Sequence, residues 1–224
     1  MKIGIILQAR LGSTRLPRKV LMDVNGECVL NRCFSNMIRA KNPEVDLYLA
    51  TTDLEQDKIL LDHAKKAGVK GFCGHPTNLI QRFYSVAQKE ELSVICRLTA
   101  DNPFIDYRFL QQAISFFIDE NLKTPAIVTS RGGLLAAGLD VEIFNSSALE
   151  KAGNQANAVD QEHVTTGMTE DMGFKVIQIS GDQLHPEYSR LTVDFPSDLE
   201  IAKDYALKFD INNRSVTNFK VRGL

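Results

Sequence analysis

Apolar and polar positions follow two periods along the first two-thirds of the chain. Short apolar runs, typical of buried strands, alternate with stretches in which apolar residues recur every three or four positions, as on one helix face. The run at residues 3–7 precedes a helical spacing of Leu30, Phe34 and Met37. The pattern predicts strands at 2–7, 46–50, 69–73, 93–98 and 125–129, and helices at 30–38, 54–67, 79–90 and 107–120.

This alternation predicts an α/β fold in which a mostly parallel, mixed central sheet lies between two layers of helices. We find no linker, internal repeat or low-complexity segment, so residues 1–224 are interpreted as a single domain. Ligands of such sheets bind beyond the carboxyl ends of the strands. That rule points to four places, at residues 8–19, 51–53, 74–78 and 99–106.

The rhythm changes after residue 130, and residues of about 131–190 are interpreted as a substrate-side subregion. Glycines interrupt the chain there, and residues 139–144 alternate like a strand. Near residue 196 a helix is expected to begin, with Ser197 as N-cap and Glu200 completing a capping box. Further strands are expected at 174–179 and 190–193 and further helices at 146–152 and 159–172, while the tail from 210 shows no period.

Charge and composition exclude several classes of partner. The formal net charge is −2, so no overall field favours nucleic acid or an anionic membrane. No stretch has the length of a membrane span or the profile of a signal peptide, and we expect a cytoplasmic protein. The four cysteines and four histidines lack the spacing of a zinc site or a redox pair. Any basic site must therefore be local.

The loop at residues 8–19 is the first candidate for such a site. It follows the first apolar run and contains Gly12 with the cations Arg10, Arg15, Arg18 and Lys19. Small residues let backbone N–H groups approach phosphate oxygens, and cations neutralise the phosphate charge. The loop is neither GxxxxGK nor GxGxxG. The alternative is a surface loop with incidental cations.

Two carboxylates follow short apolar runs in a similar context. Asp101 lies in RLTADNPFID and Asp194 in RLTVDFPSDLE, each just beyond a predicted strand and close to a proline. Mg²⁺ usually takes one or two carboxylates and leaves positions for phosphate oxygens and water. The two aspartates are therefore candidate metal ligands, although Asp101 could instead cap a turn. We expect Asp106 to cap the next helix and Asp198 to compensate a helix dipole.

A further polar cluster is formed by Asp140 and Glu142, on one face of a predicted strand, and by Glu162 and His163. Such residues could bind sugar hydroxyls or a second metal ion. They could equally form a structural ion-pair network, and the pattern does not decide between these interpretations.

Taken together, the chain resembles the cytidylyltransferases of spore-coat polysaccharide biosynthesis, which are relatives of the CMP-sialic acid and CMP-Kdo synthetases. Within the loop, Gly12, Arg15 and Lys19 match the G-x-x-R-x-x-x-K core of sugar nucleotidyltransferases. The resemblance implies a nucleotide-diphospho-sugar transferase fold and transfer of CMP from CTP to a sugar hydroxyl. It extends in order over QARLGSTRLPRKVL, LATTDLEQD, GHPTNLIQRFY, RLTADNPFID, AGLDVEIF, DQEHVT and RLTVDFPSDLE.

The resemblance also implies roles for individual residues. Arg15, Lys19 and Asp101 would be catalytic, and a homodimer is expected. Mg²⁺, or Mn²⁺ in its place, would be the cofactor. The implied sets are Gln8, Ala9 and Arg10 at cytosine and ribose; Gly12, Ser13, Arg15 and Lys19 at the triphosphate; Arg82 and Arg97 near the nucleotide; Asp101 and Asp194 at the metal; and Asp140, Glu142, Glu162 and His163 at the acceptor sugar.

Three departures from the family pattern are Arg18, Asn78 and Gln161, which replace a usual glycine, aspartate and arginine. They leave the nucleotide half intact, whereas the identity of the acceptor is not transferred from the family. A helix N-terminus behind the loop is expected to assist phosphate binding. Three other functions stay open: a glycosyltransferase of similar fold, a sugar-1-phosphate nucleotidyltransferase using UTP or dTTP, and a non-catalytic nucleotide-binding homologue.

Overall fold

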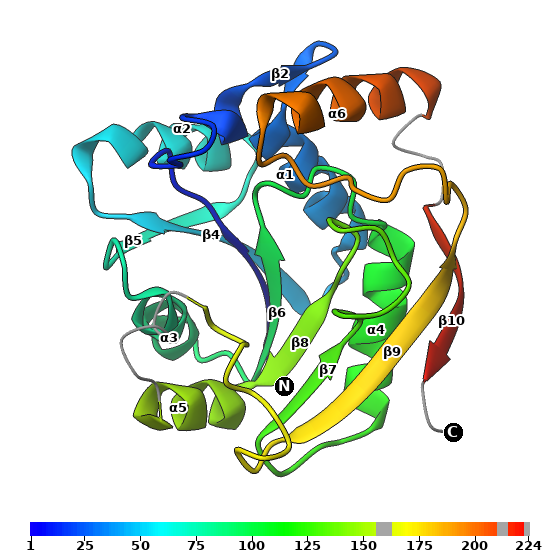
Figure 1. Ribbon diagram of the computed structural model, residues 1–224. Helices are drawn as coiled ribbons and strands as arrows, with labels where there is room; N and C mark the ends of the chain where they lie inside the picture. The colour runs from blue at the N-terminus through cyan, green and yellow to red at the C-terminus, as the bar shows by residue number, and fades with distance from the viewer. Residues whose placement is uncertain (156–162, 210–214, 222–224) are drawn as a thin grey trace.

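An eight-stranded sheet with the order β10-β9-β7-β8-β6-β1-β4-β5 forms the centre of the molecule (Figure 1). The computed structural model describes residues 1–155, 163–209 and 215–221. The strands of this sheet are β1 (Ile3–Gln8), β4 (Val45–Thr52), β5 (Lys70–Gly74), β6 (Val94–Thr99), β7 (Ala126–Thr129), β8 (Glu142–Asn145), β9 (Lys175–Gln183) and β10 (Val216–Val221).

Parallel pairing aligns the carboxyl ends of the strands that flank β1. Gln8 at the end of β1 pairs in register with Ala50 of β4 and with Thr99 of β6. Strand β8 runs antiparallel to both β6 and β7, and β10 runs antiparallel to β9. The prediction of a mostly parallel, mixed sheet is thus confirmed.

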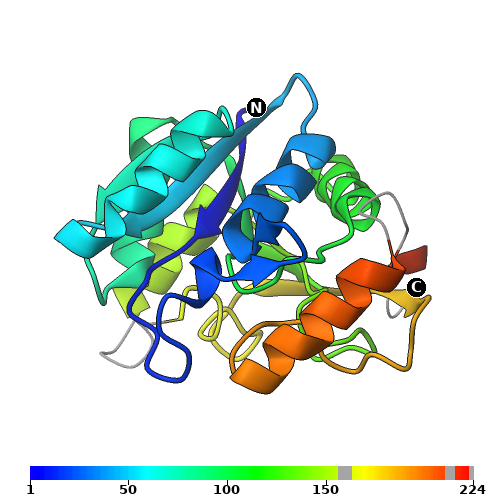
Figure 2. The same ribbon diagram turned by 90° about the horizontal axis from the view of Figure 1, so that it is seen from above.

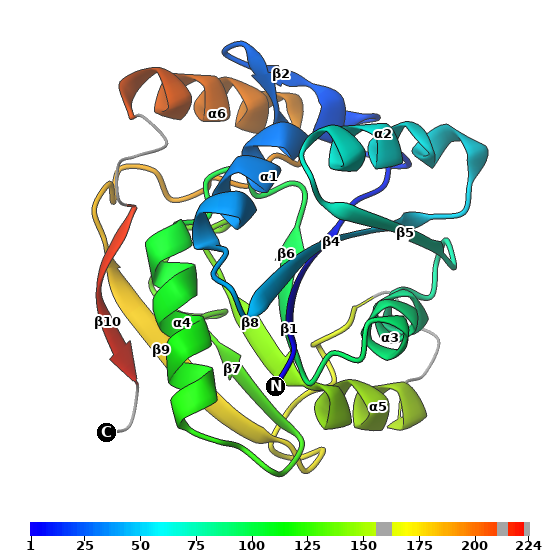
Figure 3. The same ribbon diagram turned by 180° about the vertical axis from the view of Figure 1, so that it is seen from behind.

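Helices cover both faces of the sheet, and β1 is therefore buried on both faces. Ile3, Ile5 and Leu7 pack in one apolar cluster, and Ile6 packs in another on the opposite face. Figures 1 and 3 show the two helical layers from the front and from behind. The first cluster contains residues of α1 (Val29–Ala40), α2 (Ile59–Lys66) and α4 (Tyr107–Asp119), and the second contains residues of α3 (Leu79–Lys89) and α5 (Ser146–Gln155).

The last helix, α6 (Pro196–Lys208), lies beyond the carboxyl ends of the central strands (Figures 1 and 2). It packs against a hairpin of β2 (Asp23–Val24) and β3 (Glu27–Cys28) through Val24 and Ala202. Two short 3₁₀ helices follow in the chain after β1 and β4, namely η1 (Lys19–Leu21) and η2 (Glu55–Asp57).

Several predicted elements are wrong. Residues 163–172 form turns and not a helix, while 159–162 lie outside the described residues. The predicted strand at 190–193 is an extended segment with one isolated bridge, between Ala137 and Arg190. Strand β8 begins only at Glu142, so Asp140 precedes it. The hairpin of β2 and β3 and the strand β10 were not predicted.

The start of α6 also differs from the prediction. Phe195 is the N-cap and Pro196 the first helical residue, so Ser197 lies inside the first turn. The side chain that accepts hydrogen bonds at this helix start is Asp198, which is consistent with its expected role. No helix in the described part of the chain combines the length and apolar character needed to cross a bilayer.

Candidate functional site

A cavity of about 480 Å³ opens at the carboxyl ends of β1 and β6. Three of the four predicted places contribute to its lining. The fourth, at residues 51–53, lies behind the loop: the hydroxyl of Thr52 donates to the buried carboxylate of Asp57. The lining residues are Gln8, Ala9, Arg10, Gly12, Ser13, Thr14, Arg15, Lys19, Val20, Pro76, Thr77, Leu79, Arg82, Arg97, Thr99, Ala100, Asp101, Arg131, His163 and Asp194.

Asp57 holds the loop after β1 by a hydrogen bond to the loop backbone. Its Oδ1 accepts a hydrogen bond of 2.8 Å from the backbone N–H of Leu11, whose side chain is buried. The carbonyl of Leu11 in turn accepts from the backbone N–H groups of Ser13 (2.8 Å) and Arg18 (3.1 Å). A Cβ added at Gly12 would meet only the side chain of Gln56, at 3.7 Å. Gly12 therefore leaves space above the loop.

Arg18 adopts a left-handed backbone conformation, with φ of 57°, immediately before η1. This turn directs Lys19 inward, and its side chain is only 10% exposed. The predicted helix at 30–38 is present as α1, but its N-terminus is not at the loop, because α1 begins at Val29 and the intervening η1 has only three residues. The expectation of a helix dipole at this loop was therefore wrong.

Lys19 joins the two predicted metal ligands. Its Nζ lies 2.7 Å from Oδ2 of Asp101 and 2.8 Å from Oδ1 of Asp194. The backbone adds a second link, since the N–H of Val193 donates to the carbonyl of Asp101 at 2.8 Å. Arg15 also reaches Oδ1 of Asp194, at 2.7 Å. The structure thus brings together Arg15, Lys19, Asp101 and Asp194, as the sequence predicted.

Burial alone would raise the pKa of Asp194. Hydrogen bonds and positive charge from Lys19 and Arg15 outweigh this effect, and the net pKa of Asp194 is lowered. Asp194 is therefore an ionised carboxylate at neutral pH, as a metal ligand must be.

Asp101 and Asp194 suit a hard divalent cation by their chemistry. Both offer carboxylate oxygens, and Mg²⁺ requires only one or two carboxylates when phosphate oxygens and water complete its shell. Within the described residues, no group of three or more His, Cys, Asp or Glu side chains could hold a metal ion. The pair thus fits a cation that is shared with a phosphate ligand, and metal binding stays a prediction.

At the other end of the cavity, Gln8 is the last residue of β1, and Arg97 lies two residues before the end of the neighbouring β6. Oε1 of Gln8 accepts from Nε of Arg97 at 3.0 Å, and Arg97 also forms an ion pair with Glu142. The hydroxyl of Thr165 donates to Glu142 at 2.7 Å. Glu142 is buried and already paired, so it belongs to a structural ion-pair network and does not line the cavity.

Arg82 lines the cavity, but its guanidinium is largely engaged by the backbone. It donates to the carbonyls of His75 (2.7 and 3.1 Å) and Pro76 (2.9 Å). Burial lowers the pKa of Arg82, and the charge of neighbouring Arg10 lowers it further. Arg82 therefore shapes the segment of residues 75–78, while Arg10 is the exposed cation of the pair.

The predicted acceptor residues are dispersed. His163 lines the cavity, and Glu162 lies outside the described residues. Asp140 does not line the cavity; burial, and secondarily the charge of Glu142, raise its pKa to about 6 despite nearby Arg131. Arg131 does line the cavity and was missed, although it follows the predicted strand 125–129, so the strand-end rule that found the other places could have found it.

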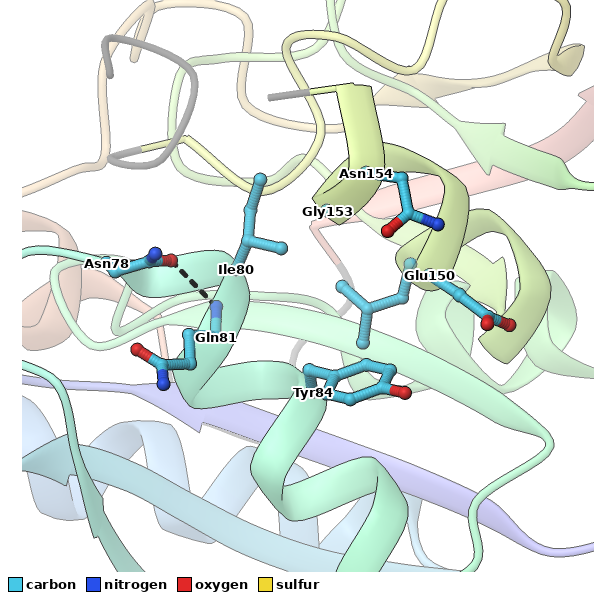
Figure 4. A pocket seen from close by; sticks show the side chains of 8 residues that line it. Asn78, Ile80, Gln81, Tyr84, Glu150, Gly153 and Asn154 are labelled. Carbon is cyan, nitrogen blue, oxygen red and sulfur yellow. Dashed lines mark hydrogen bonds between the residues drawn. The ribbon is translucent and has the colours of Figure 1, made fainter. Parts of the chain in front are cut away.

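A second cavity, of about 270 Å³, lies between α3 and α5 (Figure 4). Its lining includes Ile80, Tyr84 and Glu150, and the side chain of Asn78 there accepts from the N–H of Gln81 at 2.8 Å. It contains none of the predicted catalytic or metal-binding residues. The departure Asn78 is thus explained locally as the N-cap of α3.

Solved structures with the same architecture are known. A cytidylyltransferase from Leptospira borgpetersenii superposes with a TM-score of 0.85 at 30% identity, covering 96% of this chain and 90% of that one. A CMP-2-keto-3-deoxy-manno-octonic acid synthetase complexed with CTP superposes with a TM-score of 0.69 at 15% identity, covering 93% and 99%. The second likeness concerns the fold alone.

The mixed sheet, the cationic loop after β1 and the facing carboxylates fit a nucleotidyltransferase. The sequence comparison gives the same class. The chain is 32% identical over 210 residues to the spore coat polysaccharide biosynthesis protein SpsF of Bacillus subtilis, covering 90% of this chain and 85% of that protein. Residues 4–215 match the family model described as cytidylyltransferase, and the chain belongs to this family.

Proposed function

We propose that this protein transfers CMP from CTP to a sugar hydroxyl, with release of pyrophosphate and dependence on Mg²⁺ or Mn²⁺. The observation that carries the proposal is the contact of Lys19 with both Asp101 and Asp194 at one wall of the cavity. Membership of the cytidylyltransferase family supports CTP as the nucleotide. The resemblance to SpsF supports a sugar acceptor for polysaccharide synthesis. A cytoplasmic location and a homodimer are further parts of the proposal.

In the proposed reaction the acceptor oxygen attacks the α-phosphorus of CTP. The bond from that oxygen to phosphorus forms, the bond to the bridging oxygen of pyrophosphate breaks, and the hydroxyl proton is released. Gln8, Ala9 and Arg10, which line the cavity, would border the base and ribose, and the backbone of Gly12 and Ser13 would face the phosphates. Positioning and electrostatics supply most of the rate enhancement in related phosphoryl transfers.

Charge at the reacting phosphate is neutralised by the same wall. Asp101 and Asp194 would hold the metal ion, which draws charge from the α-phosphate and the leaving group. Lys19 and Arg15 already lie beside these carboxylates and are available to the pyrophosphate as its charge develops. Arg131 and His163 line the remaining wall, where the acceptor would bind.

A pyrophosphate-release screen tests the nucleotide and the acceptor together. CTP, UTP, dTTP and ATP are each combined with a panel of acidic and neutral sugars and Mg²⁺, and products are analysed by mass. We expect release only with CTP and at least one sugar, with formation of a CMP-sugar. Nucleotide release from a ready-made nucleotide sugar would indicate a glycosyltransferase, and CTP binding without product a non-catalytic homologue.

Removal of divalent cations tests the metal requirement. We expect EDTA to abolish pyrophosphate release and added Mg²⁺ or Mn²⁺ to restore it, because without a cation between them the two carboxylates would repel the phosphates. Full activity in EDTA would exclude the metal role of Asp101 and Asp194.

A sedimentation measurement of mass tests the homodimer, which is expected at twice the 25.0 kDa of the chain.

A further inference from the structure

We propose that Arg190 is a positioning residue that holds one oxygen of Asp194 away from the cavity, so that the other oxygen faces the metal and the nucleotide. The inference rests on the proposed function, since it concerns the orientation of a proposed metal ligand. Within the motif RLTVDFPSDLE it gives a role to Arg190 and Asp198, to which the sequence assigned no function in the site.

The contacts of Arg190 form a closed ring around Asp194. One guanidinium nitrogen lies 2.7 Å from Oδ2 of Asp194, and Nε lies 3.1 Å from Oδ1 of Asp198. The other oxygen of Asp198 accepts from the backbone N–H groups of Asp194 and Phe195, both at 2.9 Å. Side chain and backbone of Asp194 are therefore held by the same ring.

The two oxygens of Asp194 consequently have different surroundings. Oδ2 is bound by Arg190, whereas Oδ1 faces Lys19 and Arg15 on the cavity side. A carboxylate that ligates a metal through one oxygen is commonly oriented by a hydrogen bond to the other. The planar guanidinium can reach two carboxylates at fixed angles, which the single ammonium of lysine does not reproduce.

The backbone of Arg190 is fixed from the opposite side. Its bridge to Ala137 is flanked by a hydrogen bond of 2.7 Å from the N–H of Leu191 to the carbonyl of Ala137. Gly138 follows, with φ of +104°, and a Cβ there would lie 2.6 Å from the backbone nitrogen of Thr192. This close approach holds the backbone of residues 190–192 in place. The guanidinium of Arg190 therefore extends from a fixed backbone, although its side chain is 37% exposed.

The test measures metal binding without turnover. Each protein is saturated with the α,β-methylene analogue of CTP, which cannot release pyrophosphate, and Mn²⁺ binding is followed by the EPR signal of the free ion. The variants are Arg190→Ala, Arg190→Lys and Asp198→Asn. The matched control is Lys203→Ala on α6, where an exposed pair with Glu200 is lost. Circular dichroism and thermal unfolding verify that each variant is folded.

We expect the Mn²⁺ dissociation constant to rise about 10- to 100-fold in Arg190→Ala, the usual effect of removing an outer partner of a metal ligand. Arg190→Lys should recover only part of the loss, and Asp198→Asn should weaken Mn²⁺ binding as well. Binding of the analogue without metal should change less than about twofold, since Arg190 does not line the cavity. A merely structural role would not separate the two affinities.

Unchanged Mn²⁺ affinity in a folded Arg190→Ala or Arg190→Lys protein overturns the inference. Equal weakening of metal and analogue binding overturns it too, because that pattern indicates a general loss of structure. If the wild-type protein binds Mn²⁺ with the analogue but never releases pyrophosphate from CTP, the proposed function fails while the positioning role stands. Absence of Mn²⁺ binding in the wild-type protein overturns the positioning role itself.

Discussion

Lys19 is the residue at which the loop and both carboxylates meet. Its ammonium is almost buried and lies within 2.8 Å of an oxygen from each aspartate. A buried charge is stable only when it is paired, and here the pairing also fixes where positive charge is available to a phosphate. The side chain of Lys19 therefore both stabilises the site without ligand and supplies the positive charge that the proposed chemistry uses.

Replacement of Lys19 by alanine is expected to lower turnover by about 100-fold or more, as the loss of one transition-state charge contact often does. The measurement is pyrophosphate release with CTP and its acceptor at saturating concentrations. Lys203→Ala, at an exposed pair far along α6, is the control and should leave turnover unchanged. Near-normal turnover of the Lys19 variant would contradict the proposed role.

Asp140 makes stability depend on pH. Its pKa is raised by burial to about 6 in the folded state, from 3.8 for an ordinary aspartate. The folded protein thus binds this proton more tightly than the unfolded chain. The resulting stabilisation is complete below about pH 4 and is lost as pH rises through about 6.

Asp140→Asn, which mimics the neutral carboxyl, should therefore be more stable than the wild type at pH 8, by up to about 3 kcal/mol. The gain should shrink at pH 5, and urea unfolding at both pH values measures it. Asp171→Asn, at an exposed position, should show little change at either pH. A gain that is equal at both pH values would mean that titration of Asp140 is not its cause.

At the scale of elements, short irregular segments hold the site. The three residues of η1 place Lys19, and the left-handed conformation of Arg18 sets their direction. A residue with a Cβ loses about 1–2 kcal/mol in this conformation, whereas glycine does not. The backbone of the loop is therefore strained at Arg18, the residue immediately before Lys19.

Arg18→Gly should raise the free energy of unfolding by up to about 1 kcal/mol, since relief of strain exceeds the added entropy of the unfolded chain. Arg18→Ala is the matched control, because it removes the same side chain and retains the strain. Denaturant unfolding of both variants gives the comparison. Equal stability of the two would show that the backbone at residue 18 is not strained.

The carboxylate of Asp106 connects two elements. It accepts from the N–H groups of Arg108 and Phe109 at the start of α4, and from Ser215 and Val216 at the start of β10. Asp106→Ala should lower the free energy of unfolding by about 2–4 kcal/mol, from a lost cap and buried unpaired N–H groups. Ser197→Ala, at the position wrongly predicted to cap α6, should change it by less than about 0.5 kcal/mol.

Periodicity predicted the regular elements well and the irregular ones poorly. Residues 190–193 resemble a strand because Leu191 and Val193 are buried, but their N–H groups bond to Ala137 and Asp101 outside any ladder. Only tertiary structure decides between these partners. The hairpin of β2 and β3 did have a local signal, since Asn25 and Gly26 form its turn with positive φ.

For the whole molecule, the strand-end rule located the cavity because parallel strands end at one edge of the sheet. It correctly joined the loop of residues 8–19 to Asp101. The strand-end rule could not show that Glu142 forms an ion pair with Arg97. A side chain on a strand can face either side of the sheet, and here the partner comes from another strand. The same limit applies to Arg190, whose partners depend on how the segment before α6 approaches the loop.

The contact of Lys19 with Asp194 spans 175 residues of sequence. Closing so long a loop costs entropy of about 4–5 kcal/mol, so we expect this contact to form after the neighbouring strands of the sheet have paired. On a growing chain the loop of residues 8–19 and Asp101 are made early, and Asp194 is made near the end. We therefore expect the site to be completed late in folding, and loosening of the segment before α6 to separate Asp194 from Lys19 while the sheet remains intact.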